Sequence, residues 1–399
     1  MKSLPQKISL AGIFLFAFSI PISFVPAEFG MALAILGWAA DGLMNKRWKF
    51  QGHAVLLPLA FYLAWNLLSS LISPRPLHSL WAWADNEWSV CIMLVMFWTV
   101  EDVQTLRRLV YTFLATSSIA MIYGIWQTFY GVELYRGIDL ARMENLYRSV
   151  GFNGFYLTFA GFAMSVFFLA ASFFIETKSK VRWLLGAAAL AAFLAVVGTF
   201  ARSIWLSFLV AIPASGFLRG RKMGLILTGS FIVVIAAVFL IMPDIRHRAF
   251  SIMDISANET RLNLWKTSIK ISNDFPILGI GEDNFDYYFE RYRVEGYYDA
   301  TGHPHNDYFS ALVQSGYPGL LAFIAIWVVA IRAGYRSWRS ATDPTTRAVI
   351  AGAMMGILGF MVGSFFQNYY GTFANCLGWW FITGLLMSAV KLELAGVKS

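Results

Sequence analysis

Two histidines lie in a short polar segment that leads directly into a long apolar run. The segment reads Gly302-His303-Pro304-His305-Asn306-Asp307-Tyr308. A neutral imidazole is a suitable general base near neutral pH, because its pKa lies close to that pH. A histidine at a helix start is often only a cap or a core hydrogen-bonding group. Two histidines beside Asn306 and Asp307, where a loop enters a membrane helix, instead favour a catalytic task.

Two arginines expected on the same side of the membrane could bind an anionic substrate. Arg202 lies in a tight turn between two apolar runs, and Arg261 lies four residues before Trp265 in a polar segment, so that the pair shares one helix face. A guanidinium keeps its charge and binds phosphate oxygens in a bidentate fork. Arg202 could also simply contact lipid phosphates, and Arg261 could lie on a solvated helix face. Together with a histidine they favour transfer from a lipid-diphosphate donor.

Other chemistry has little support in the sequence. The segments expected on the same side contain neither an HExxH motif nor an Asp-x-Asp pair, so we expect neither a metal nor a cofactor. Cys91 and Cys376 lie singly in apolar runs and are expected to be core residues. The Gly-x-Gly at 279–281 is followed by Glu282 and Asp283, which would repel a phosphate, so it does not indicate a nucleotide loop.

The elements that must position these residues are membrane helices. Of the 399 residues, 58% are hydrophobic and only 14% are charged, whereas about 25% are charged in a soluble domain. The composition predicts an all-α polytopic membrane protein, with one transmembrane domain over 1–399 and about 12 transmembrane helices. The first apolar run resembles a secretory signal but lacks a cleavage site, so we expect an uncleaved span. The expected spans are 8–25, 28–44, 54–73, 84–100, 108–129, 153–175, 183–200, 203–218, 223–242, 306–331, 348–366 and 376–391.

The charge distribution predicts the orientation of these spans. With the N-terminus inside, most of the 31 Lys and Arg residues fall in inside segments and most of the 23 Asp and Glu residues fall outside. Because Lys and Arg concentrate in cytoplasmic loops, both termini are expected in the cytoplasm. The net charge of +8 therefore indicates topology, and not binding of nucleic acid. The outside connections are 130–152, 201–203 and a large loop over 243–304, between the ninth and tenth spans.

The large loop is expected to contain two short helices. Asn258-Glu259-Thr260 is typical of a helix start, and Asn273-Asp274 is typical of its end. A second short helix is expected over Glu282 to Arg293. Further on, the segment Ser315 to Gly319 is expected to kink the tenth span.

Four motifs occur in order over about 195–330. They are Ala201-Arg202-Ser203-Ile204-Trp205-Leu206, Glu259-Thr260-Arg261-Leu262-Asn263-Leu264-Trp265, Phe275-Pro276-Ile277-Leu278-Gly279-Ile280-Gly281 with Asn284-Phe285, and His303-Pro304-His305-Asn306-Asp307-Tyr308 leading to Gly316-Tyr317-Pro318-Gly319-Leu320. Together these motifs resemble the O-antigen ligase / O-antigen polymerase family. Upstream of them, Gly151 to Phe155 resembles a weaker family signature but lacks the usual proline, which leaves the role of Asn153 open.

The resemblance implies a glycosyltransferase of the GT-C type in the bacterial inner membrane, with a periplasmic active site. The family's ligases transfer O-antigen polysaccharide from undecaprenyl diphosphate to lipid A-core in lipopolysaccharide biosynthesis. By position, Arg202 and Arg261 would hold the donor diphosphate, and His305 would take the proton from the acceptor hydroxyl, with inversion at the anomeric carbon. A diphosphate leaves without a general acid, whereas a sugar hydroxyl is a poor nucleophile without a base. The supporting residues would be His303, Asn306 and Trp265.

Several alternatives stay open. Polymerases of the family often have two large loops, and 130–152 is too short to count as one, so we favour a ligase. The family's protein O-oligosaccharyltransferases usually have a longer chain, with an added C-terminal region. A flippase for lipid-linked sugars is the alternative from another class, but its interior should carry charge at mid-membrane depth. Here the charged residues fall mainly at span ends and in loops.

Overall fold

The apolar runs form α-helices, because a backbone in lipid must satisfy its hydrogen bonds within its own segment. The computed structural model describes residues 2–46, 48, 50–251, 254, 258–298 and 301–396. The helices up to α9 are α1 (Leu4–Ser19), α2 (Phe24–Asn45), α3 (Leu56–Leu71), α4 (Pro76–Glu87), α5 (Val90–Thr99), α6 (Val103–Tyr130), α7 (Tyr156–Glu176), α8 (Arg182–Gly198) and α9 (Arg202–Leu218). The later helices are α10 (Arg221–Ile241), α11 (Pro243–Phe250), α12 (Glu259–Asp274), α13 (Phe285–Tyr292), α14 (Asp307–Ser340), α15 (Pro344–Gly363) and α16 (Phe373–Gly396).

The described residues bear out an all-α membrane protein. Among them, seven helices are long and apolar enough to cross a membrane, namely α2, α6, α7, α10, α14, α15 and α16, while α1, α3, α8 and α9 are shorter apolar helices. The expected span 84–100 is not one helix, because it contains the end of α4 and all of α5, with a break at Trp88 and Ser89. The number of twelve spans stays a prediction.

Two antiparallel hairpins of two-residue strands follow α6. They pair β1 (Val132–Glu133) with β2 (Ile138–Asp139) and β3 (Arg142–Met143) with β4 (Leu146–Tyr147). The second hairpin contacts α11, because the backbone N–H of Asn145 donates to Asp244 at 3.0 Å. The short connection expected over 130–152 therefore packs against the start of the large loop.

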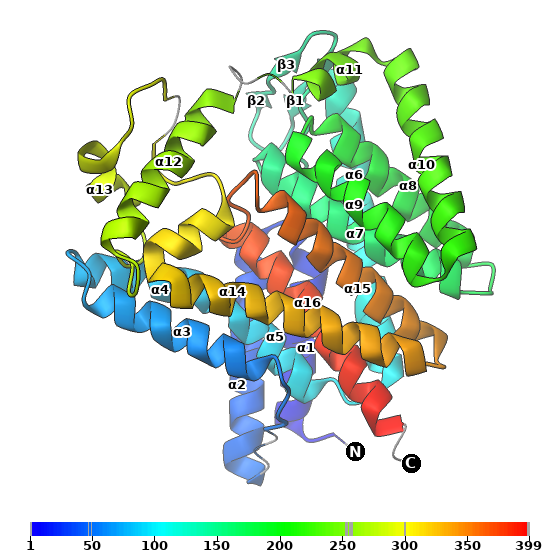
Figure 1. Ribbon diagram of the computed structural model, residues 1–399. Helices are drawn as coiled ribbons and strands as arrows, with labels where there is room; N and C mark the ends of the chain where they lie inside the picture. The colour runs from blue at the N-terminus through cyan, green and yellow to red at the C-terminus, as the bar shows by residue number, and fades with distance from the viewer. Residues whose placement is uncertain are drawn as a thin grey trace.

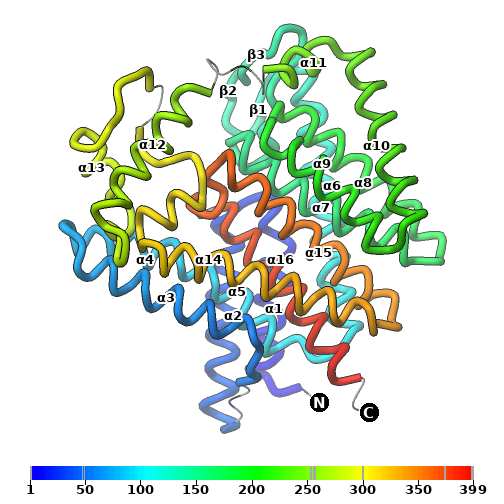
Figure 2. Tube along the Cα trace, in the orientation of Figure 1, coloured from blue at the N-terminus to red at the C-terminus, as the bar shows by residue number. Residues whose placement is uncertain are grey.

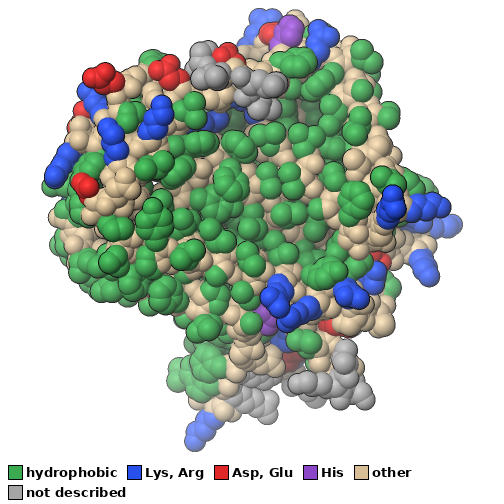
Figure 3. Space-filling model, viewed as in Figure 1, with side chains coloured by type: hydrophobic (Ala, Val, Ile, Leu, Met, Phe, Trp, Pro, Cys, Tyr) green, Lys and Arg blue, Asp and Glu red, His purple; other side chains and the backbone are tan. Residues whose placement is uncertain are grey.

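The expected outside connections lie together at the end of the molecule opposite to the two termini (Figures 1 and 2). The strands and helices α11, α12 and α13 lie at this end. On the face seen in Figure 3, hydrophobic side chains cover the middle, and charged side chains gather toward the ends. This arrangement is the one that a membrane-embedded bundle requires. Which end faces the cytoplasm, and whether 243–304 is one extramembrane loop, stay predictions.

The core of the bundle is formed by α7, α15 and α16. In the most apolar part of α7 and of α15, 78% of residues are buried, whereas the value for α10 is 6%. Large aromatic side chains fill the centre, where the rings of Trp327 and Trp379 stack with centroids 4.5 Å apart. Helix α10 packs mainly against α9 and α11. It is therefore a peripheral element, with most of its apolar surface exposed.

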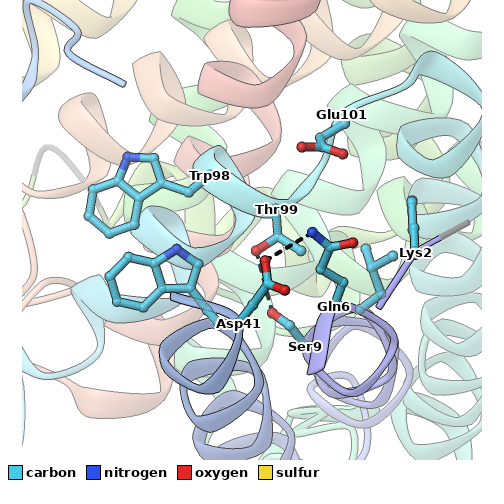
Figure 4. Close-up of a pocket in the computed structure, with 9 residues that line it drawn as sticks. Lys2, Gln6, Ser9, Asp41, Trp98, Thr99 and Glu101 are labelled. Atoms are coloured by element: carbon cyan, nitrogen blue, oxygen red, sulfur yellow. Dashed lines mark hydrogen bonds between the residues drawn. The ribbon is translucent and has the colours of Figure 1, made fainter. Parts of the chain in front are cut away.

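A small cavity of about 30 Å³ lies between α1, α2 and α5 (Figure 4). Its carboxylate, Asp41, accepts hydrogen bonds from Ser3, from Gln6 at 2.9 Å and from Asn45 at 2.7 Å. A cavity of this size holds only about one or two waters. Because neighbouring side chains already satisfy Asp41, we interpret this cluster as a contact that holds α1 against α2.

Candidate functional site

The histidine turn, residues 302–306, is held on both sides of His305 just before α14. Trp265 of α12 donates its indole N–H to the carbonyl of Pro304 at 3.1 Å. Asn306 caps α14, because its Oδ1 accepts two backbone N–H groups of the first helical turn. The Nδ2 of Asn306 also donates to a carbonyl in the loop between α15 and α16 at 2.9 Å. Trp265 and Asn306 thus fix the backbone around the histidine.

The two imidazoles make different hydrogen bonds, which sets their tautomers. The Nδ1 of His303 accepts the backbone N–H of His305 at 3.1 Å, so a neutral His303 carries its proton on Nε2. The Nδ1 of His305 lies 3.3 Å from the Oε1 of Gln367, which can only accept, so Nδ1 donates. The lone pair of neutral His305 is therefore on Nε2. Burial, together with the neighbouring His305, lowers the pKa of His303 to about 4.

The backbone of His305 is itself unusual. Its φ of 53° lies in the left-handed region, which few residues other than glycine adopt. Such a conformation costs about 1–3 kcal/mol and persists where the surroundings fix it. Here the neighbouring contacts of Trp265 and Asn306 hold it, and the two imidazole ring centroids lie 4.2 Å apart. The turn is therefore a built feature that presents two rings side by side.

Arg202 and Arg261 lie in a cluster of four arginines that also contains Arg148 and Arg248. The charge of Arg202 is repelled by those of the other three. Burial and the charges of Arg148 and Arg261 lower the pKa of Arg248. Within the described residues, no carboxylate lies at ion-pair distance from any of the four. Concentrated positive charge without acidic partners is what a bound polyanion would neutralise.

Neutral groups hold the cluster in place. Arg202 begins α9 and donates from Nη1 to the carbonyl of Ser251 at 2.6 Å, and from Nη2 to Asn258 at 3.3 Å. The guanidinium of Arg148 lies 4.1 Å from the ring centroid of Tyr156. These contacts orient the guanidinium groups without cancelling their charge.

Helix α12 connects the arginine cluster to the histidine turn. Arg261 and Trp265 lie one turn apart on this helix, as their spacing predicted. Arg261 contributes to the cluster, while Trp265 contacts the histidine turn and packs against Phe309, with ring centroids 5.7 Å apart. The start at Glu259 and the end at Asp274 agree with the sequence prediction, whereas α13 is shorter than the predicted 282–293.

A second connection runs through the loop between α15 and α16, residues 364–372. Asp307 accepts the backbone N–H of Tyr369 at 3.0 Å. The hydroxyl of Tyr369 lies 2.8 Å from that of Ser203, directly after Arg202. In the sequence, Asp307 stood out only as a neighbour of the histidines, whereas its contacts make it the anchor of this loop. The loop also carries Gln367, whose approach to His305 had no signal in the sequence.

The Gly-rich segment 275–281 packs against the kink in α14. Gly316 has φ of 66°, so α14 kinks where the sequence predicted. A Cβ at Gly316 would strike the carbonyl of Ile277, so this approach requires glycine. The backbone N–H of Ile280 donates to the carbonyl of Val313 at 2.9 Å, which the kink leaves without its helical partner. The two glycine motifs therefore form one structural joint beside the site.

Two cavities flank the site. An apolar cavity of about 260 Å³ lies between α8, α9, α10 and α11, and its lining includes Trp205, Phe239 and Ala249. Trp205 lies one turn beyond Arg202, and Ala249 follows Arg248, so this cavity borders the arginine cluster. A polar cavity of about 250 Å³ borders the histidine turn. Its polar lining includes Asp85, Asn86, Glu282, His303, Ser310, Gln314 and Asn368.

The weaker upstream signature has a structural explanation. Gln127 of α6 accepts the backbone N–H groups of Val150 and Gly151 at 3.1 and 2.8 Å, and it donates to the carbonyl of Gly151. Gly151 has φ of 56°, which glycine adopts readily. These contacts hold the segment that leads from Arg148 into α7. Asn153 is buried, and its Oδ1 makes no hydrogen bond among the described residues.

Contacts through α12 and through the loop 364–372 connect the elements that carry the predicted residues, and the structure adds other residues. Arg148 and Arg248 were missed, although both lie in connections that the charge pattern had assigned to the same side. A search of those connections for further arginines would have found them. Within the described residues, no group of three or more His, Cys, Asp or Glu side chains could hold a metal ion.

Comparison with protein-family models matches residues 186–324 to a family described as O-antigen ligase. The matched stretch runs from α8 into α14 and contains Arg202, Arg261 and His305. The resemblance that the motifs predicted is therefore confirmed. A comparison with curated proteins gave no significant match.

Proposed function

We propose that this membrane protein is an O-antigen ligase, because residues 186–324 match a family described by that name. It transfers O-antigen polysaccharide from undecaprenyl diphosphate to lipid A-core, which completes lipopolysaccharide. The observation that carries this proposal is the cluster of four unpaired arginines between an apolar cavity and a histidine turn. A lipid-diphosphate donor has a matching sequence of parts, because its apolar chain is followed by the anionic diphosphate and then by the sugar.

The arginine cluster binds the donor diphosphate. Arg202 and Arg261 hold the phosphate oxygens, and Arg148 and Arg248 add charge around them. The polyprenyl chain extends from the diphosphate into the apolar cavity between α8, α9 and α10. The same guanidinium groups stabilise the charge that the diphosphate gains as it leaves.

His305 acts as the general base. Its Nε2 takes the proton from the acceptor hydroxyl while that oxygen attacks the anomeric carbon of the donor sugar. The new C–O bond forms as the bond to the diphosphate breaks, and the electron pair of the broken bond goes to the diphosphate. Attack opposite the leaving group inverts the anomeric centre. Gln367 supports this role. Its Oε1 accepts the N–H at Nδ1 of His305, and this hydrogen bond leaves the lone pair of the imidazole on Nε2.

In this proposal the site faces the periplasm and both termini lie in the cytoplasm of a cell with an inner membrane. The polymerase and the protein O-oligosaccharyltransferase of the same family use the same donor and remain the alternatives. A flippase is disfavoured, because α11, α12 and the hairpins that carry or adjoin the site residues lie at one end of the bundle (Figure 1).

A product assay with purified components tests the proposal. The full chain in nanodiscs receives labelled undecaprenyl-diphosphate-linked O-antigen together with lipid A-core. We expect the label to move to lipid A-core. Label in longer lipid-linked chains would instead indicate a polymerase, and label that stays on the donor would refute both activities. For substitutions in the arginine cluster, the matched control is Arg108→Ala, because Arg108 is exposed at the end of the bundle that carries the termini.

A further inference from the structure

The polar cavity beside the histidine turn contains two buried polar atoms without partners. Ser310 and Glu282 are each 7% exposed. The Oγ of Ser310 and the Oε2 of Glu282 make no hydrogen bond within the described part of the chain. Both residues line this cavity of about 250 Å³. Because a buried polar atom without a partner is costly, two of them at one cavity indicate that a polar ligand completes the site.

The backbone around Glu282 is fixed before any ligand arrives. The Oε1 of the Glu282 side chain accepts a hydrogen bond from the side-chain amide of Gln314 at 3.1 Å. The preceding residue, Gly281, has φ of 82° and donates its N–H to the carbonyl of Gln314 at 2.9 Å. The joint between the Gly-rich segment and the kink of α14 therefore aims Glu282 at the cavity. The second carboxyl oxygen is left for a ligand.

The remaining lining supplies hydrogen-bonding groups but little positive charge. His303 carries its proton on Nε2 and can donate, and amides are present at Asn86 and Asn368. No Lys or Arg lines the cavity. Arg75 pairs with Asp286 at 2.6 Å, and the imidazole of His78 lies 3.0 Å from a carboxyl oxygen of Asp283.

Acidic side chains, by contrast, are plentiful around this cavity, since Asp85 and Asp283 line it together with Glu282. Burial and the charges of Glu87 and Asp283 raise the pKa of Glu282 to about 8, so its carboxyl group holds a proton near neutral pH and can donate a hydrogen bond. A phosphate would therefore meet two aspartates, with no lysine or arginine among the lining residues.

We propose that this cavity binds the acceptor sugar, and that it takes an uncharged, hydroxyl-rich ring in preference to a phosphorylated one. The inference rests on the proposed transferase function, because it assigns the second substrate of the same reaction. The cavity lies next to the proposed base, since it is lined by His303, whose ring lies against that of His305. None of the four arginines is among the residues that line this cavity.

The donor diphosphate and a metal ion fit the cavity poorly. The diphosphate would lack positive partners among the lining groups. A metal would need several converging ligands, and the described residues contain no group of three or more candidate side chains. Carboxyl, amide and hydroxyl groups instead match the donors and acceptors of a sugar ring.

Ser310→Ala is the sharpest test, because the Ser310 hydroxyl makes no hydrogen bond among the described residues, so its loss should leave the thermal midpoint unchanged. We expect the KM for lipid A-core to rise about 2- to 10-fold, the worth of one neutral hydrogen bond, with the KM for the donor unchanged. Glu282→Gln, which removes the carboxyl group but keeps the contact with Gln314, should act in the same direction. Matched controls are Ser340→Ala at the far end of α14 and Glu290→Gln on the exposed face of α13. An unchanged acceptor KM in both cavity variants, or a raised donor KM, would overturn the inference.

Binding without turnover separates this inference from the proposed function. Core oligosaccharide without its acyl chains is prepared in a phosphorylated and a dephosphorylated form. Each form is titrated into the full chain in nanodiscs, and binding is measured by saturation-transfer NMR. We expect the unmodified protein to bind the dephosphorylated oligosaccharide about tenfold more tightly than the phosphorylated one. The Ser310→Ala variant should bind the dephosphorylated oligosaccharide more weakly than the unmodified protein does. This result together with absent transfer would leave the sugar site standing and refute the ligase. No binding, or preference for the phosphorylated form, would refute the sugar site whatever the transfer assay gives.

Discussion

The two sides of the histidine turn differ in charge and in how their groups are satisfied. On one side, four arginines lie together beside an apolar cavity, and neutral groups orient them. On the other side, carboxyl, amide and hydroxyl groups line a polar cavity, and two of its buried atoms lack partners. One side suits an anion on a lipid chain, and the other suits a neutral polar ring. In the proposed reaction, the histidine turn would separate an anionic lipid donor from a neutral acceptor sugar.

The largest effect is expected at His305, the proposed general base. His305→Ala should lower transfer by about 100- to 10,000-fold, the usual worth of a general base, while the protein still accumulates in the membrane. The assay is attachment of polysaccharide to lipid A-core in a cell whose own ligase is deleted. His53, at the end of the bundle that carries the termini, provides the matched control His53→Ala.

His303→Ala sharpens this prediction. Its Nδ1 already accepts a hydrogen bond and its pKa is low, so it is expected to matter less than His305. A larger loss at His303 than at His305 would reverse the assignment of the base. Normal ligation by His305→Ala would remove the histidine turn from the mechanism.

Changes in the arginine cluster should come next. Arg202→Ala and Arg261→Ala should each lower transfer strongly and raise the KM for the donor, with the acceptor KM little changed. Lysine at either position should rescue only in part, because the bidentate fork is lost. Steady-state kinetics with both substrates varied distinguishes the two sides. A raised acceptor KM in these variants would break the division between donor and acceptor.

A smaller effect is expected at Gln367, a positioning residue that contacts the Nδ1 of His305. Gln367→Ala should lower transfer by about tenfold, the typical worth of a residue that orients a functional histidine. Gln367→Glu should retain more activity and shift the lower limb of the pH–rate profile to higher pH. The added carboxylate favours the protonated imidazole and raises its pKa, so a higher pH is needed to free the base. An unshifted profile in Gln367→Glu would remove Gln367 from this role.

No effect is expected from EDTA. The polar cavity contains carboxyl groups, but they do not form a group of metal ligands among the described residues. Transfer by the purified protein should therefore survive chelation. Loss of activity that Mg²⁺ restores would show that the acidic side binds a cation, and the two sides would then differ less than the charges indicate.

Local signals in the sequence were enough to predict part of this structure. The bounds of α12 and the kink at Gly316 follow from caps, spacing and glycine, which act within a few residues. The span expected over 84–100 was wrong because its polar residues make partners far away in the sequence. Glu87, for example, is buried and accepts from the hydroxyl of Tyr370 at 2.8 Å. A hydropathy pattern contains no information about such a partner.

The candidate site divides in the same way. Arg202, Arg261 and His305 lie in motifs, so the sequence could identify them. Gln367 reaches His305 only because Asp307 anchors the loop 364–372 through contacts about sixty residues apart. The polar cavity is assembled from α4, the segment before α13, α14 and the same loop, so no single stretch of sequence indicates it.

The loose attachment of α10 has a consequence for how quickly the protein can find its donor. This helix packs mainly against α9 and α11, and it forms one wall of the apolar cavity. If the donor chain lies there, it enters sideways from the bilayer and never crosses water. Encounter is then a search in two dimensions, set by the surface density of the donor and the viscosity of the membrane. Stiffening the lipid should slow the overall rate even where the chemistry at His305 is unchanged.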